Sequence, residues 1–432
     1  MSQILIIGAG PAGLTIAKEL KERNISFEQI EKHSDVGGLW DIENPGTPLY
    51  ETAHFISSKT LSAFPDYPMP SSYPDYPSRK QILNYIKDYA RNFDLYENIK
   101  FNLFAKKVTQ NPDQSWQVEL SNGEVKNYEK VICATGMQWD PVKPNVLGNF
   151  SGKIIHSVEY KNSQDLKGKK VLVVGAGNSG CDIACDIGRV AEQTYLSVRR
   201  GYWFIPKHVF GIPSDVFAET GPKLPMFLQQ KIFGILLRLL NGDVTRLGLP
   251  KPDHRLFETH PTLNTEILQR LQHGDVIAKP DIKEFSGNEV IFKDGSKEQI
   301  DVVIFATGYK HSIPYAQEYF GNPQHPIDMY LTIFSKKYKN LFAMGFIETN
   351  SGAYNLFGIA AKVLASYISD EIRNPERAKE FEKIINSKNP DLSGGIKFIN
   401  SSRHEGYVDA SAIKKEFLKL IKHMGWTEAR VS

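Results

Sequence analysis

The sequence predicts an α/β fold with two strand–turn–helix–strand units, the second inserted into the domain that contains the first. In each unit a short apolar strand is followed by a glycine-rich turn and a helix with 3.6-residue periodicity. Two apolar strands that end in Ala-Thr-Gly, at residues 131–136 and 302–308, bracket the second unit. We interpret them as the points where the chain leaves one domain and returns to it. Such units are typical of Rossmann-like dinucleotide-binding domains.

Length and composition fit a multidomain chain that binds small molecules. The chain has 432 residues, and its 52 Lys and Arg exceed its 49 Asp and Glu by only three, so neither nucleic acid nor an anionic membrane is an expected partner. Three cysteines without a CxxC spacing argue against a disulfide framework, a metal site and a dithiol pair. A reducing, cytoplasmic location is therefore expected.

The first unit carries a GxGxxG fingerprint at Gly8, Gly10 and Gly13. Missing side chains permit a tight turn and close approach of the backbone to a pyrophosphate, and the helix that follows directs its first N–H groups at the anion. Glu31 ends the next strand, where a carboxylate accepts hydrogen bonds from ribose hydroxyls and rejects a 2′-phosphate. This site suits FAD or NAD. The expected elements are a strand at 3–7, a helix at 12–22 and a strand at 26–31.

The second unit repeats the fingerprint without the acid. Its second strand runs into Arg199 and Arg200, whose guanidinium groups favour a 2′-phosphate and hence NADPH. Two solvated surface arginines are the alternative. The expected elements are a strand at 170–174, a helix from the turn to about residue 190 and a strand at 194–198. The predicted NADPH contacts are Gly175, Gly177, Asn178, Ser179, Gly180, Arg199 and Arg200.

Two dinucleotide sites in one chain predict hydride transfer from a nicotinamide to a flavin. The first site is therefore assigned to FAD, and the class narrows to flavin-dependent reductases, oxidases and monooxygenases. The predicted domains are an FAD domain at 1–165 and 301–432 and an inserted NADPH domain at 166–300. Long irregular segments at 41–80 and 202–260 are expected to shape the substrate pocket.

A motif between the fingerprints identifies a family. Phe150, Gly152, His156 and Tyr160 spell FxGxxxHxxxY, which resembles the signature of the flavin-containing monooxygenases. The related Baeyer–Villiger enzymes end their version with Trp followed by Pro or Asp, whereas this chain has Tyr160 followed by Lys161. The resemblance covers nearly the whole chain. Its further matches are Gly37 to Trp40, Ser57 to Lys59, Phe64 to Pro68 and Ala306 to Tyr309.

The resemblance implies roles for several single residues. It places Gly38 and Trp40 close to the flavin, although Trp40 could equally be ordinary core, and it gives His156 a part in positioning the domain junction. Asn350 precedes a C-terminal helix that is expected to contact the flavin ring, and the alternative is that Asn350 or Ser351 caps this helix. The predicted FAD contacts are Gly8, Gly10, Gly13, Glu31, Gly38, Trp40 and Asn350.

One position departs from the family pattern. Familiar members have an Asn directly before Ser-Ser-Lys, near the flavin, and this chain has Ile56 there. In the family that Asn is thought to help hold the oxygenated flavin. Its loss puts the lifetime of that species, or the substrate range, in question.

The resemblance implies that NADPH reduces FAD, that O2 forms a flavin C4a-hydroperoxide, and that this species oxygenates an amine nitrogen or a sulfide sulfur. No acid–base residue of the protein and no metal is assigned to the chemistry. Charged residues recur from Lys414 to Arg430, where vertebrate members have an apolar tail, so no membrane anchor is expected; a homodimer is left open. The alternatives are an NADPH oxidase that releases hydrogen peroxide, a Baeyer–Villiger enzyme acting on ketones, and a nucleotide-sensing binding protein.

Overall fold

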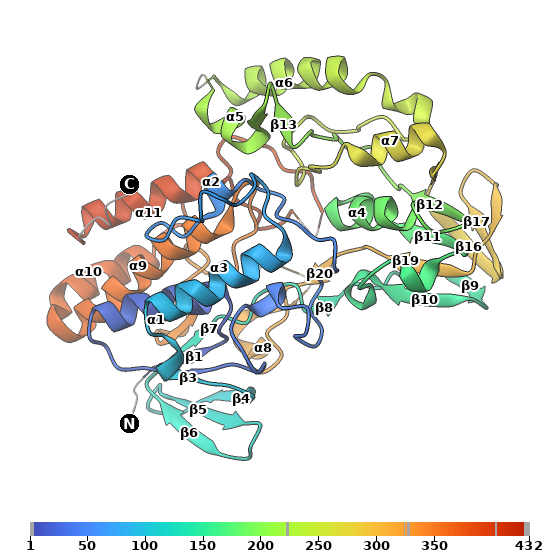
Figure 1. Ribbon diagram of the computed structural model, residues 1–432. Coiled ribbons are helices and arrows are strands. Elements are labelled where there is room, and N and C mark those ends of the chain that lie inside the picture. Colours follow the sequence, from blue (N-terminus) through green and yellow to red (C-terminus); the bar gives the residue numbers. More distant parts are fainter. Residues whose placement is uncertain (1–3, 222–223, 324, 326–328, 402–403, 427–432) are drawn as a thin grey trace.

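Two parallel five-stranded sheets organise the chain (Figure 1). The computed structural model describes residues 4–221, 224–323, 325, 329–401 and 404–426, so Gln3 of the first expected strand and Arg430 lie outside it. The first sheet has the order β21-β7-β1-β2-β3, and all its neighbours run parallel. Its strands are β1 (Ile4–Ile7), β2 (Glu28–Ile30), β3 (Ile99–Lys100), β7 (Lys130–Cys133) and β21 (Leu341–Ala343).

The second sheet has the same architecture as the first. Its order is β10-β19-β11-β12-β15, again with parallel neighbours. Each sheet therefore has the first strand of its glycine unit at the centre, the second strand on one side and an Ala-Thr-Gly strand on the other. The strands of the second sheet are β10 (Lys153–His156), β11 (Lys170–Val174), β12 (Gln193–Ser197), β15 (Val276–Lys279) and β19 (Val302–Phe305).

The chain crosses between the sheets at the two Ala-Thr-Gly segments. It leaves the first sheet after β7 and returns after β19, and the two crossings pair as an antiparallel ribbon of β8 (Asp140–Pro141) and β20 (Tyr309–Lys310). The second sheet extends beyond the expected limits 166–300 at both ends, because β10 and β19 belong to it. The expected limits left out these two strands because each of them pairs with residues distant in sequence. We propose that the inserted domain begins after Gly136 and ends at Gly308.

Smaller, mostly antiparallel sheets accompany the two parallel sheets. A three-stranded sheet follows the first domain's early strands, and a four-stranded sheet, in which β9 runs parallel to β16, lies beside the second domain (Figure 1). Their strands are β4 (Ala105–Gln110), β5 (Trp116–Leu120) and β6 (Val125–Tyr128), then β9 (Leu147–Phe150), β16 (Ile282–Gly287), β17 (Glu289–Phe292) and β18 (Lys297–Gln299), and the hairpin β13 (His208–Val209) and β14 (Ile212–Pro213).

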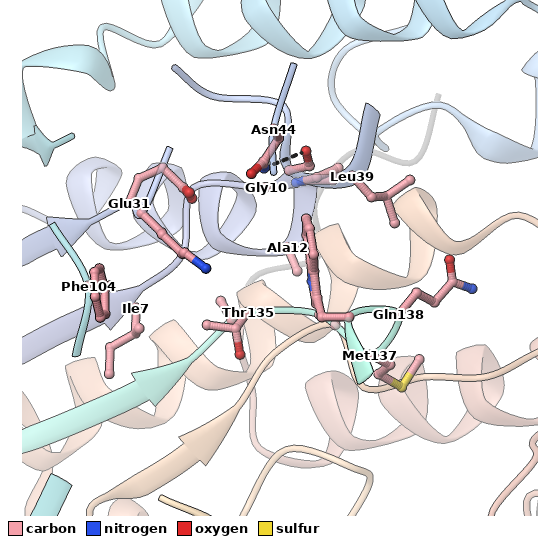
Figure 2. A pocket seen from close by; sticks show the side chains of 18 of the residues that line it. Ile7, Gly10, Ala12, Glu31, Leu39, Asn44, Phe104, Thr135, Met137 and Gln138 are labelled. Carbon is pink, nitrogen blue, oxygen red and sulfur yellow. Dashed lines mark hydrogen bonds between the residues drawn. The ribbon is translucent and has the colours of Figure 1, made fainter. Parts of the chain in front are cut away.

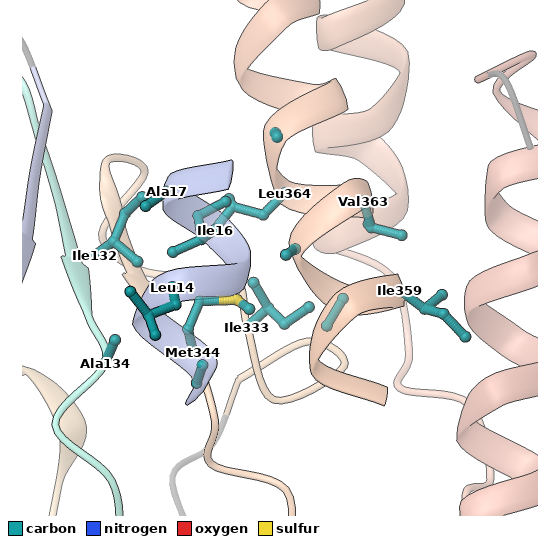
Figure 3. Close-up of a cluster of buried hydrophobic side chains, with 14 of the residues drawn as sticks. Leu14, Ile16, Ala17, Ile132, Ala134, Ile333, Met344, Ile359, Val363 and Leu364 are labelled. Atoms are coloured by element: carbon teal, nitrogen blue, oxygen red, sulfur yellow. The ribbon is translucent and has the colours of Figure 1, made fainter. Parts of the chain in front are cut away.

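The core of the first domain lies between its sheet and two long helices. Strand β1 is a solid apolar run, as expected for a parallel strand covered on both faces. Leu14 and Ile16 of α1 share one buried cluster with Ile132 of β7 and with Val363 and Leu364 of α9 (Figure 3). The helices are α1 (Pro11–Glu22), α2 (Lys59–Ser62), α3 (Arg79–Asn92), α4 (Asn178–Ile187), α5 (Ser214–Thr220), α6 (Met226–Asn241), α7 (Glu266–His273), α8 (Gln317–Phe320), α9 (Ala353–Arg373), α10 (Pro375–Ile385) and α11 (Ala410–His423).

Helix α6 lies on the outer edge of the molecule (Figure 1). Its buried face contains Gln230, which donates a hydrogen bond to the Leu256 carbonyl, while Phe227 and Leu239 are 67% and 78% exposed. Within the described ranges, no helix combines the length and the apolar character needed to cross a lipid bilayer. Helix α6 therefore packs through a narrow, partly polar face and leaves large apolar side chains in solvent.

Candidate functional site

The first glycine turn packs so tightly that side chains have no room. Gly8 has φ +111°, and a Cβ atom there would lie 2.6 Å from the carbonyl oxygen of Ala134, the alanine of the first Ala-Thr-Gly. A Cβ atom at Gly13 would lie 2.0 Å from the Gly8 carbonyl oxygen. These contacts hold the start of α1 against the ends of β1 and β7, as the fingerprint predicts.

The second glycine turn repeats this geometry in the second sheet. Gly175 has φ +108°, and its Cβ would lie 2.7 Å from the carbonyl oxygen of Ala306, in the second Ala-Thr-Gly. At Gly180 the Cβ would lie 1.9 Å from the Gly175 carbonyl oxygen. The two Ala-Thr-Gly segments thus serve the same packing role in both domains, which the sequence showed only as a repeated tripeptide.

The helices that leave the two turns begin without capping side chains. Gly10 and Gly177 are the N-caps of α1 and α4, with φ and ψ of −74° and −178°, and of −74° and −179°. The first N–H groups of a helix lack partners within the helix, and its N-terminus carries a partial positive charge. Both ends are therefore suited to hold a pyrophosphate.

A large cavity opens at the first of these helix ends. It has a volume of about 770 Å³, within the range of cofactor sites. Figure 2 shows Gly10 between Glu31 and Leu39 in the wall of this cavity. Predicted residues in its wall are Gly8, Gly10, Glu31, Gly38 and Trp40, and Gly13 lies behind the wall as a packing residue.

Glu31 is buried at the carboxyl end of β2. Its carboxylate accepts hydrogen bonds from the backbone N–H groups of Ala9, at 2.6 Å, and His33, at 2.8 Å. Burial raises the pKa of Glu31, while these two donors oppose the shift. The side chain is thus fixed in the cavity wall beside the glycine turn, as expected for a residue that meets a ribose.

Gly38 and Trp40 form the wall near the other end of the cavity. Gly38 has φ +57°, and its Cβ would lie 3.1 Å from the Gly10 Cα, so two glycines make this close approach possible. The Trp40 ring packs edge-on against Phe55 with centroids 4.7 Å apart. Trp40 therefore belongs to the hydrophobic core and also lines the cavity, so a core position does not exclude a position in the cavity wall.

Asn350 is placed differently from the prediction. It does not line the cavity among the described residues; its amide donates to Asp409 at 2.9 Å and its oxygen accepts from the Ala410 N–H at 3.0 Å, at the start of α11. Gly352 is the N-cap of α9, so neither Asn350 nor Ser351 caps that helix. Other residues at the start of this helix line the cavity: Ala353, Tyr354 and Phe357.

Some predicted residues of the second site have side chains that contact other parts of the protein, and others have side chains that are exposed. The Asn178 amide donates to the Pro261 carbonyl at 2.9 Å and accepts from the Leu263 N–H at 2.9 Å, so it holds a loop. Ser179 is exposed in the first turn of α4. Arg200 contacts Asp253 at 3.3 Å, whereas exposed Arg199 has no hydrogen bond or ion pair within the described part of the chain.

The FxGxxxHxxxY motif makes structural contacts along its whole length. Phe150 packs against Phe285 at a centroid distance of 5.1 Å, and a Cβ at Gly152 would lie 2.5 Å from the Asp301 carbonyl oxygen. The Tyr160 hydroxyl donates to Asp186 of α4 at 2.5 Å. The motif thus fastens the crossing segment to the second sheet and to α4.

His156 is fully buried at the junction of the two domains. Its Nδ1 accepts from the Val158 N–H at 3.2 Å, and its ring packs edge-on against Tyr309 of β20 at 5.2 Å. Burial lowers its pKa to about 4, and the positive charge of Lys143 adds to the shift. The ring is therefore neutral near pH 7, which fits a positioning role and not acid–base chemistry.

Ile56 is half-buried and lies outside the set of described residues that line the cavity. Its neighbour Phe55 packs against two cavity-wall residues, Trp40 and Tyr354. No sequence motif marks Tyr354 or the segment 134–139, which begins with the first Ala-Thr-Gly and lines the cavity beside Gly10. The repeated Ala-Thr-Gly is the signal that could have located that segment.

Comparison with known proteins gives a family match over most of the chain. A family model described as flavin-binding monooxygenase-like matches residues 1–421. Flavin-containing monooxygenase 5 of Rattus norvegicus is 35% identical over 357 residues, which cover 77% of this chain and 66% of the rat protein. The chain thus spans slightly less than two thirds of the length of this relative.

Solved structures share the fold. S-allyl-L-cysteine S-oxygenase from Allium sativum superposes with a TM-score of 0.66 at 17% identity and covers 99% of this chain and 89% of its own. Cyclohexanone monooxygenase from Rhodococcus sp. Phi1, bound to NADP+, gives a TM-score of 0.70 at 18% identity, with 98% of each chain covered. At these identities the likeness shows the two-domain α/β fold alone.

The buried, neutral state of His156 predicts a specific pH dependence of stability. An unfolded histidine takes up a proton near about pH 6.5, whereas folded His156 does so only at about pH 4. The stabilisation from neutral, buried His156 is therefore complete above about pH 6.5. It is lost as the pH falls toward about 4, the pKa of His156 in the folded state. We expect unfolding experiments on His156→Gln to show a loss of stability between about pH 7 and pH 5 that is smaller than in wild type by on the order of 2 kcal/mol. Equal slopes in the two proteins would contradict the assignment.

Proposed function

Because the chain belongs to the flavin-binding monooxygenase-like family, we propose that it is an FAD- and NADPH-dependent monooxygenase. It transfers one oxygen atom of O2 to the nitrogen of an amine or the sulfur of a sulfide in a small organic substrate. The overall reaction consumes one substrate, one NADPH, one proton and one O2 and gives NADP+, water and the oxygenated product. A cytoplasmic location and a homodimeric state stay predictions from the sequence.

The observation that carries this proposal is the repeated glycine turn with an uncapped helix at each of two sheets. One turn opens into a cavity with a carboxylate at the ribose position, and the other is followed by an arginine that has no ion pair in the described chain. FAD is therefore assigned to the first site and NADPH to the second. The solved cyclohexanone monooxygenase with this fold is bound to NADP+, which supports the second assignment.

The residues of the chain hold, orient and shield the cofactors. When bound, FAD supplies the redox chemistry, accepting a hydride and activating O2. The backbone of the first turn would hold its pyrophosphate and Glu31 its ribose, since both line the cavity. Tyr354 and Phe357, in the first two turns of α9, line the cavity, so the partial positive charge of this helix end faces it. Apolar walls there exclude water.

Two alternative chemistries, release of hydrogen peroxide and oxygenation of ketones, each depend on a different part of the sequence. Ile56 has no hydrogen-bonding side chain where the family often has Asn, which favours an oxidase that releases hydrogen peroxide. Baeyer–Villiger oxygenation of ketones is less favoured because the motif ends in Tyr160 and Lys161. Amine or sulfide oxygenation is the function that agrees with the motif.

A balance of reactants and products tests the function. The purified yellow protein is supplied with NADPH, O2 and a sulfide, a tertiary amine or a ketone, and NADPH loss, peroxide release and product are measured together. We expect one oxygenated sulfide or amine for nearly every NADPH consumed. Peroxide equal to NADPH with every substrate would identify an oxidase, ester formation from the ketone a Baeyer–Villiger enzyme, and a lack of NADPH turnover a binding protein.

Gly10→Ala tests the first site. A Cβ at Gly10 has its nearest protein contact at 3.4 Å, from the Gly38 Cα, so the variant should fold; but the methyl group enters the cavity where the pyrophosphate is to lie. We expect colourless protein with the thermal stability of the wild-type apoprotein. Gly13→Ala is the contrast, since its Cβ collides with the Gly8 carbonyl and should destabilise the turn itself. Full FAD loading of Gly10→Ala would refute the assignment.

Arg199→Ala tests the second site. Arg199 has no ion pair among the described residues, whereas Arg200 contacts Asp253. We expect Arg199→Ala to raise the KM for NADPH by about tenfold or more, the cost of one charge-assisted contact to a phosphate, and to leave the KM for NADH nearly unchanged. The comparison of both coenzymes in one variant is its own control. Equal changes for NADPH and NADH would remove the 2′-phosphate assignment.

A further inference from the structure

One segment of the first domain, residues 44–53, connects the FAD cavity with the second domain. At its beginning Asn44, Pro45 and Gly46 line the cavity, and Asn44 donates a hydrogen bond to the Gly38 carbonyl at 3.0 Å (Figure 2). At its end Tyr50 reaches helix α4, which starts at the second glycine turn. A shift of this segment therefore moves the wall of one site relative to the helix of the other.

Lys161, directly after the FxGxxxHxxxY motif, holds the middle of this segment. Its ammonium group donates to the carbonyls of Thr47, at 2.7 Å, and Leu49, at 3.1 Å, and its own carbonyl accepts from the Glu51 N–H at 2.8 Å. Burial lowers the pKa of Lys161, and no carboxylate pairs with it in the described part of the chain. A half-buried cation that is satisfied by carbonyls fixes these carbonyls in position.

One tyrosine from each domain bonds to α4, Tyr50 from segment 44–53 and Tyr160 from the end of the FxGxxxHxxxY motif. The Tyr50 hydroxyl donates to Asp182 at 2.9 Å, and the Tyr160 hydroxyl donates to Asp186, one turn further along the helix, at 2.5 Å. Asp182 also accepts from the Asn264 amide at 2.6 Å, and its burial raises its pKa. The two tyrosine rings lie 5.8 Å apart. Buried hydrogen bonds to charged groups are strong, and breaking one leaves a desolvated polar atom.

From these contacts we propose that two interdomain connections, Lys161 to the carbonyls of segment 44–53 and Tyr50 to Asp182, form a clamp that positions the flavin wall against the nicotinamide domain for hydride transfer. The bond from Tyr160 to Asp186 lies within the second domain and holds Lys161 in place for the clamp. The proposal rests on the proposed function. In this step NADPH is oxidised to NADP+ while FAD takes up two electrons and one proton. The reacting atoms must approach to about 3–3.5 Å, and an error of about 1 Å costs up to about a hundredfold in rate. The clamp residues are positioning residues and do not line the cavity among the described residues.

The chain contains a matched control for each variant. Lys59 also donates to two carbonyls, those of Ser71 and Tyr73, but both lie in the same irregular segment of the first domain. Tyr73 similarly donates its hydroxyl to the Gln81 carbonyl at 3.1 Å, without reaching the second domain. Lys59→Met and Tyr73→Phe therefore remove bonds of the same type that do not join the two sites.

The experiment compares holoenzymes of Lys161→Met, Tyr50→Phe and both controls in anaerobic rapid mixing with NADPH. We expect Lys161→Met to slow flavin reduction at saturating NADPH by about tenfold, with the FAD content and the apparent Kd for NADPH nearly unchanged, and Tyr50→Phe to slow it less. Lys161→Arg, which keeps two donors, should restore much of the rate. The absorbance change of oxidised flavin on addition of NADP+, a readout independent of turnover, should be altered in the clamp variants alone.

Thermal unfolding separates positioning from stability. Lys161→Met and Lys59→Met should lower Tm by similar amounts, while only the former slows reduction. Wild-type rates in both Lys161→Met and Tyr50→Phe, or equal slowing in the controls, would overturn the clamp and leave the proposed function standing. If Lys161→Met does not fold, Tyr50→Phe, which loses a single hydroxyl, decides the question by the same two readouts. If NADPH does not reduce the flavin of the wild-type protein, the proposed function and the clamp are both overturned.

Discussion

The structure depends on one close backbone contact that it makes twice, between a glycine after the central strand and the carbonyl oxygen at the end of the neighbouring strand. At Gly8 and Ala134, and again at Gly175 and Ala306, any side chain would come within 2.6–2.7 Å of that oxygen. This contact sets where each helix starts, so that an uncapped helix end faces the edge of each sheet. Both predicted cofactor sites follow from it.

Two such sites in one chain create a second requirement, since the reacting parts of the two cofactors must meet. The ribbon of β8 and β20 carries the chain between the sheets, and His156 packs against its first residue in β20. Segment 44–53 adds a connection that starts in the cavity wall and ends on α4. Interfaces between domains of one chain usually permit motion, and contacts of this kind restrict it.

Local sequence patterns predicted the parts of the fold that local physics determines. Both glycine units lie within a few residues of their expected bounds, because turn, strand and helix signals act over short distances. Glu31 and Trp40, which local patterns marked as candidates, both line the cavity. Asn350 bonds to Asp409, which is distant in sequence, and no local pattern connects the two residues. Strands β10 and β19 likewise join the second sheet through pairings with distant residues, so local patterns did not assign them to it.

The fold alone does not determine which substrate is oxygenated, because structures of an S-oxygenase and of a cyclohexanone monooxygenase match this chain with TM-scores of 0.66 and 0.70. The residues that distinguish the two families in sequence, Tyr160 and Lys161, do not line the cavity in the described part of the chain. Their bonds reach Asp186 and the carbonyls of segment 44–53 instead. This dipeptide thus contacts both α4, which starts at the second glycine turn, and the segment that begins in the cavity wall. Tyr354 and Phe357, which line the cavity, lie outside every motif that the sequence displayed, so the cavity wall combines residues that a motif marks with residues that none marks.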